Sequence, residues 1–129
     1  MKKIFITLFA IMVLFSLTAV ACAQDVSVNR AEVIQSYDEV MVNFALENNV
    51  DYDLGRTRIM MMSYEMPFVV KKRASEFNEG DVLSKTLIEP VYNVEPGFYT
   101  IRLSASNEDH NFRRVVFREI YVDAYGNVY

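Results

Sequence analysis

The chain has 129 residues, which is the length of one domain, and its formal net charge at pH 7 is −4. An acidic chain repels nucleic acid and anionic lipid headgroups at long range, so we expect neither as a partner. The single cysteine, Cys22, excludes a disulfide within the chain. We therefore expect a core that is held together by packing alone.

The first 23 residues have the three parts of a secretory signal. Lys2 and Lys3 give a positively charged start, an apolar run extends from Ile4 to Leu17, and Ala21-Cys22-Ala23 supplies the small residues of a cleavage site. This pattern predicts a signal peptide over residues 1–23, cleaved before Gln24, and a mature domain over residues 24–129.

Two alternatives for the N-terminal segment remain open. Ala19-Val20-Ala21-Cys22 loosely resembles a bacterial lipobox, in which case Cys22 is lipidated and anchors the protein. Residues 4–23 are also about long enough to span a bilayer uncleaved. In every case we expect the domain outside the cytoplasm, secreted or at the cell surface, with membrane contact only through this segment.

Short strand and turn signals alternate after the leader, as is typical of an all-β domain. We expect strands over Asp25–Val33 and over Val40–Glu47, where apolar and polar side chains alternate with a period of two. Residues 30–48 also fit the spacing of an amphipathic helix, but their β-branched valines favour the strand. The next segment, residues 47–55, is rich in Asn, Asp and Gly and is expected to form a loop.

Two further strands are expected over Arg56–Tyr64 and Phe68–Ser75. Pro67 excludes a central position in a sheet for the second of them, because proline lacks the N–H that a ladder needs. The charges of Lys71-Lys72-Arg73 suit an edge strand, since they discourage pairing with another chain.

The C-terminal half contains the most regular strand pattern. After a turn at residues 78–81 we expect a strand over Val82–Ile88, whose facing the pattern leaves open. Tyr99–Ser106 alternates strictly and predicts a half-buried strand, followed by a hairpin loop at residues 107–111. The final strand, Phe112–Val122, is partly apolar on both faces. We therefore expect something to cover its second face, with the tail Ala124–Tyr129 as the candidate.

The segment Pro96-Gly97-Phe98-Tyr99-Thr100-Ile101-Arg102-Leu103 resembles a characteristic strand of immunoglobulin-like extracellular domains, similar to CARDB-type and fibronectin type III-like modules. The closing segment Arg118–Val122 resembles the last strand of small secreted domains on archaeal and bacterial cell surfaces. The resemblance implies an all-β fold, a single immunoglobulin-like β-sandwich of about seven strands. It also implies structural roles for Gly97 and Tyr99, whose hydroxyl would bond back to upstream backbone, and a loose association with surface assembly or adhesion.

Catalytic and metal-binding groups are scarce. The only histidine, His110, lies in a polar loop, and the only cysteine lies in the leader, so we expect neither a Ser-His-Asp nor a cysteine nucleophile. We predict that the protein is not an enzyme and needs no cofactor. Asp51 and Asp53, followed by Gly55, resemble part of a calcium loop without its distal glutamate. The alternative is an ordinary Asp-stabilised turn.

Strand edges and end loops are the remaining candidates for binding. We expect partner contact at the predicted edge strand, and at the loop Asn48–Gly55; the edge residues are Phe68, Val70, Lys71, Lys72 and Arg73. Together with Arg113-Arg114, the basic residues 71–73 form either a patch for an anionic envelope polymer or a solvated edge. Three tyrosines of the C-terminal segment form either an interaction strip or a cap on the sandwich; they are Tyr121, Tyr125 and Tyr129.

These observations predict a non-enzymatic extracytoplasmic binding or structural module. We expect it to act through protein–protein contacts with another cell-envelope or secreted protein. One alternative is a carbohydrate-binding module, in which Tyr and Phe form the aromatic platform because the chain has no Trp. Another is a secreted inhibitor or chaperone of sandwich fold.

Overall fold

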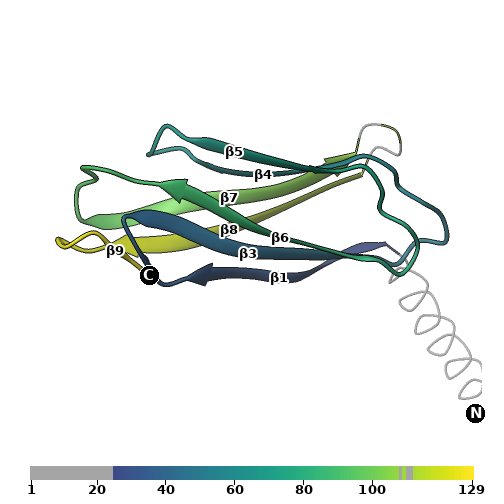
Figure 1. The fold of residues 1–129 in the computed structure, drawn as a ribbon, viewed down its shortest axis with the longest axis horizontal. Coiled ribbons are helices and arrows are strands. Elements are labelled where there is room, and N and C mark those ends of the chain that lie inside the picture. The colour runs from purple at the N-terminus through teal and green to yellow at the C-terminus, as the bar shows by residue number, and fades with distance from the viewer. Residues whose placement is uncertain (1–24, 108, 110–111) are drawn as a thin grey trace, which may run out of the picture.

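Two antiparallel β-sheets pack face to face along the long axis of the molecule (Figure 1). The computed structural model describes residues 25–107, 109 and 112–129. The segment predicted as a signal peptide, with Cys22, lies outside these residues, as does His110. In the described part of the chain, no helix is long and apolar enough to cross a membrane.

The smaller sheet has three strands in the order β1-β3-β6. Their bounds are β1 Val26–Ile34, β3 Glu39–Asn48 and β6 Val82–Pro90. Along β3 the even positions from Val40 to Leu46 point into the core, because successive side chains of a strand point to opposite faces. The register sets Leu83 opposite Leu46 and Leu87 opposite Val42, which fixes the inward face of β6.

The larger sheet has six strands in the order β2-β9-β8-β7-β4-β5. Their bounds are β2 Ser36–Tyr37, β9 Asn127–Val128, β8 Phe112–Val122, β7 Gly97–Asn107, β4 Thr57–Ser63 and β5 Val69–Ala74. The two two-residue strands, β2 and β9, pair with each other and extend the sheet beyond β8. Within the described residues, seven longer strands therefore build the sandwich, which agrees with the prediction of about seven strands.

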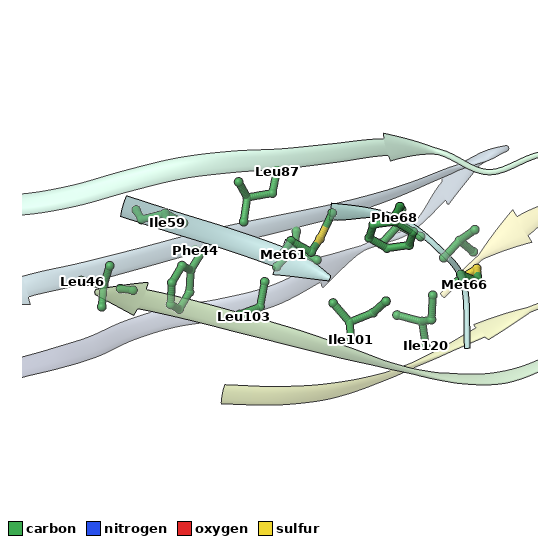
Figure 2. Packing of buried hydrophobic residues seen from close by; sticks show 14 of the residues in the cluster. Phe44, Leu46, Ile59, Met61, Met66, Phe68, Leu87, Ile101, Leu103 and Ile120 are labelled. Carbon is green, nitrogen blue, oxygen red and sulfur yellow. The ribbon is translucent and has the colours of Figure 1, made fainter. Parts of the chain in front are cut away.

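The core lies between the sheets and is almost entirely apolar (Figure 2). Each long strand contributes side chains from one face; the fully buried ones include Phe44, Leu46, Ile59, Met61, Leu87, Ile101, Leu103 and Ile120. Alternation along β4 buries Met61 and turns Met60 and Met62 to the outer face of the sheet. Burial of this kind is worth about 1.5–3 kcal/mol for a large aliphatic or aromatic side chain, so the core holds the sandwich without a disulfide.

Two expectations are decided by the structure. Residues 30–48 form strands β1, β2 and β3, so the strand interpretation is confirmed and the helix is excluded. The expected cover over the second face of β8 is wrong. The tail forms β9, which lies beside β8 in the same sheet and leaves Phe117 53% exposed on the outer face.

Candidate functional site

Strand β5 is the terminal strand of the larger sheet, as predicted for residues 68–75. Lys71, Lys72 and Arg73 are exposed, and Val70 is half-buried against the core. Phe68, expected as a partner contact, is only 9% exposed because its ring packs into the core just before β5 begins. The surface offered by this edge therefore consists of its backbone and the three basic side chains.

The edge at β1 in the smaller sheet is closed by two arginines from the facing sheet. Arg114 of β8 donates from Nε to the carbonyl oxygen of Val26 at 2.9 Å, and Arg118 donates from Nε to that of Ala31 at 2.9 Å. Arg114 also forms an ion pair with Asp25. Side chains that occupy edge carbonyls hinder strand addition, so the edge at β1 is protected in a way that the edge at β5 is not.

A row of basic side chains crosses the outer face of the larger sheet. The register places Arg73 of β5 opposite Arg58 of β4, Arg58 opposite Ser106 of β7, and Ser106 opposite Arg113 of β8. We call Arg73, Arg58 and Arg113 the arginine row. Alternation sends Lys72 and Arg114 to the opposite side of the sheet, so the basic patch predicted from residues 71–73 and 113–114 is divided between two faces.

A hollow of about 850 Å³ lies over this end of the sheet. Its lining is mostly polar and includes a further arginine and one carboxylate; the lining residues are Arg56, Thr57, Arg58, Arg73, Ala74, Ser75, Ser106 and Asp109. Among the described residues of the lining, three guanidinium groups outnumber the one carboxylate, Asp109, so the lining has a net positive charge that favours an anionic ligand.

The loop at residues 48–55 is organised by buried hydrogen bonds. Asn48 is fully buried and donates from Nδ2 to the carbonyl oxygens of Phe77 at 2.8 Å and Tyr52 at 3.1 Å. Asp53 accepts hydrogen bonds at Oδ1 from the N–H of Gly55 at 2.8 Å and of Phe77 at 3.1 Å. Asp53 therefore acts as the Asp of a stabilised turn.

The fold brings no further ligand to the candidate calcium site at Asp51 and Asp53. Asp51 is exposed, and one oxygen of Asp53 already serves the turn. Among residues 25–107, 109 and 112–129, no three His, Cys, Asp or Glu side chains come close enough to hold a metal ion.

Tyr99 forms the corner that the resemblance implies for it. Its hydroxyl donates a hydrogen bond of 2.5 Å to the carbonyl oxygen of Glu95, four residues upstream. Gly97 begins β7 and pairs with Val122 at the end of β8. Both residues shape the connection into β7 and thereby position the neighbouring ring of Phe98.

An aromatic strip lies on the outer face of the larger sheet, at the end away from the arginine row. The ring centroids of Phe98 and Tyr121 are 5.0 Å apart, and those of Tyr121 and Tyr129 are 6.4 Å apart with planes 29° from parallel. The three rings are 68%, 38% and 48% exposed. Tyr125, which the sequence groups with Tyr121 and Tyr129, lies instead in the turn between β8 and β9 and is 80% exposed.

Asp123 holds the turn that brings Tyr129 back beside Tyr121. Its Oδ1 accepts hydrogen bonds from the N–H groups of Tyr125 and Asn127, both at 2.9 Å, and its Oδ2 accepts one from Asn127 Nδ2 at 3.0 Å. Desolvation alone raises the pKa of Asp123, but the hydrogen bonds to its charged form outweigh this effect. The pKa therefore lies below its ordinary value.

Sequence reasoning missed several residues of these surfaces. The sequence pattern places Arg58 only in a strand, because the pairing that sets it opposite Arg73 depends on the register between two strands. Phe98 was assigned to a turn-and-strand motif, although it joins the aromatic strip. Strict alternation along each strand places such residues on a face, but no local signal shows which strands are neighbours.

The chain matches no protein-family model and no curated protein. Among solved structures, a calcium binding mutant of Bacteroides uniformis beta-glucuronidase 2 contains a similar fold, with a TM-score of 0.50 and 12% sequence identity. The similarity covers 76% of this chain and 12% of that chain. At this identity the likeness concerns the fold alone, and it agrees with the all-β sandwich described above.

Proposed function

We propose that this chain is a non-enzymatic binding or structural module that works outside the cytoplasm and docks another cell-envelope or secreted protein at the edge strand β5. The observation that carries the proposal is the difference between the edges at β1 and at β5. Arg114 and Arg118 occupy carbonyl groups of β1, whereas β5 ends the larger sheet and most of its residues are exposed. A partner strand that adds to such an edge gains main-chain hydrogen bonds.

The charges on β5 support a partner of opposite sign. Pairing of β5 with its own copy would bring Lys71, Lys72 and Arg73 against the same three cations, which like-charge repulsion disfavours. An acidic strand would instead set a carboxylate against each of them. The predicted leader supports export of the domain to the compartment where such a partner is available.

Site-specific photo-crosslinking in the native host tests this proposal. A photo-reactive residue at position 72 should yield one discrete adduct, and the substitution Lys71→Glu should abolish it. The matched control places the same residue at position 84, which is exposed on β6, an edge strand of the smaller sheet. Equal adducts at both positions, or an adduct at position 72 that survives Lys71→Glu, would count against docking at β5.

A second candidate, a carbohydrate-binding module, is favoured by the aromatic strip. Phe98, Tyr121 and Tyr129 expose ring surface side by side, which is the platform that such modules present to sugar rings. A glycan array is the direct test. Binding that disappears with Tyr121→Ala and persists with Tyr52→Ala, a tyrosine in the loop at residues 48–55, would support the carbohydrate function.

A further inference from the structure

The arginine row contradicts the rule that like charges avoid each other across a sheet. Arg58 and Arg73 stand directly opposite on β4 and β5, and such a pair destabilises the sheet. Within the described ranges, the ion pairs join Arg30 to Glu32 and Arg114 to Asp25, so neither member of the pair is neutralised by them. In the described part of the lining, Asp109 is the one carboxylate of the hollow over this pair, and it forms no ion pair with either arginine. A feature that breaks a local rule in this way points to a functional site.

The neighbouring positions make room for a ligand. Ser106 lies between Arg58 and Arg113 across the sheet, and its short side chain forms part of the lining of the hollow. The hollow of about 850 Å³ lies over Arg58, Arg73 and Ser106, and Arg56 adds a guanidinium group to its wall. Arginine suits carboxylate and sulfate groups because its planar guanidinium group donates two parallel hydrogen bonds.

We propose that the arginine row and its hollow bind the acidic groups of a polysaccharide that lies across the larger sheet. Neighbouring strands are about 5 Å apart, so the Cα atoms of Arg73 and Arg58 lie about 5 Å apart and those of Arg58 and Arg113 about 10 Å apart. Long basic side chains at this regular spacing suit repeated acidic groups along a polymer. A peptide is the poorer occupant, because the backbone groups on a sheet face are already used in the ladder and offer it no main-chain hydrogen bonds.

This site goes beyond the docking edge proposed above. The two sites share Arg73, but Arg58 and Arg113 lie on β4 and β8, and the docking edge is the backbone of β5. Substitutions at positions 58 and 113 therefore test the polysaccharide site without changing β5. The aromatic strip lies on the same face along β8, where Tyr121 is eight positions from Arg113, a distance of about 26 Å. A long polysaccharide can therefore contact both features.

Binding is measured by isothermal titration calorimetry with four defined polymers: polygalacturonate, heparin, neutral dextran and poly-L-glutamate. We expect polygalacturonate or heparin to bind, more weakly at higher salt because screening reduces the attraction, and dextran not to bind. Arg58→Gln with Arg113→Gln should weaken binding by at least about tenfold, since each removes a charge-assisted hydrogen-bond donor. Arg30→Gln is the matched control, because it removes one exposed cation from the opposite face.

A second readout separates a binding role from a structural one. Arg58→Gln removes the like-charge pair, so its Tm should rise by about 1–4 °C while binding falls. The proposal is overturned if no acidic polysaccharide binds, if poly-L-glutamate binds more tightly than both polysaccharides, or if Arg30→Gln weakens binding as much as the double variant. It is equally overturned if Arg58→Gln lowers the Tm. None of these outcomes affects the cross-linking result at position 72. Docking at β5 and polysaccharide binding at the arginine row can therefore be refuted independently.

Discussion

Replacing Asn48 by alanine tests whether buried hydrogen bonds hold the loop end of the sandwich. The fully buried Asn48 side chain makes three hydrogen bonds: two from Nδ2 to the carbonyl oxygens of Phe77 and Tyr52, and one at Oδ1 from the N–H of Val50 at 2.9 Å. Each net contribution is about 0.5–1.5 kcal/mol, so Asn48→Ala should lower the free energy of unfolding by about 3 kcal/mol. That loss is a large part of the total free energy of unfolding of a typical domain, which is roughly 5–15 kcal/mol.

Urea unfolding followed by far-ultraviolet circular dichroism is the assay, because the chain has no Trp for fluorescence. The midpoint should fall while the slope with denaturant stays constant, since the same surface is exposed on unfolding. Asn43→Ala is the matched control: Asn43 accepts one exposed hydrogen bond from Thr86 Oγ1 at 2.9 Å and should cost less than about 1 kcal/mol. A loss at Asn48 no larger than at Asn43 would refute the reasoning.

Three further predictions follow from the turns of the other end. Tyr99→Phe removes the corner hydrogen bond and should cost about 1 kcal/mol in the free energy of unfolding by urea titration; an unchanged midpoint would contradict a structural role. Gly126→Ala should destabilise by at least about 1 kcal/mol more than Gly80→Ala: both glycines have positive φ, +88° and +78°, but only at position 126 would the added Cβ meet the Asp38 carboxylate. Because the pKa of Asp123 is lowered by folding, its contribution to stability is present above the unfolded pKa and is lost as pH falls through the folded pKa. Carboxyl-carbon NMR titration should give a pKa below that of an unstructured peptide, and a value at or above it would show that the hydrogen bonds do not favour the charged form.

Strands could be predicted from the sequence where one face of the strand is buried, because apolar and polar residues then alternate with a period of two. Val40–Glu47 and Tyr99–Ser106 alternate over whole strands, and both segments form strands with the expected inward faces. The edge position of β5 was also predictable, because Pro67 and three consecutive basic residues both disfavour a central strand. Each of these signals lies within one segment of the chain, so it can be recognised without knowing which strands are neighbours in the sheet.

The inward face of β6 and the environment of β8 were not predictable in the same way. Either alternation of Val82–Ile88 buries two apolar residues, and only pairing with β3 selects Leu83 and Leu87. The two-sided apolar pattern of β8 predicts that another segment covers its second face. The tail instead extended the sheet sideways, because its backbone pairs with the free edge of β8 and leaves the face of β8 open.

By itself, the sequence determined the element types, the core side of the regular strands and the exposed character of β5, since each depends on the chemistry of residues within one segment. Tertiary structure decided which side chains share a surface. Arg58, Arg73 and Arg113 are far apart in the chain and meet in one row because the register of three strand pairs aligns them. The register between strands depends on which side chains the whole core buries. The arginine row therefore cannot be predicted from any single segment of the sequence.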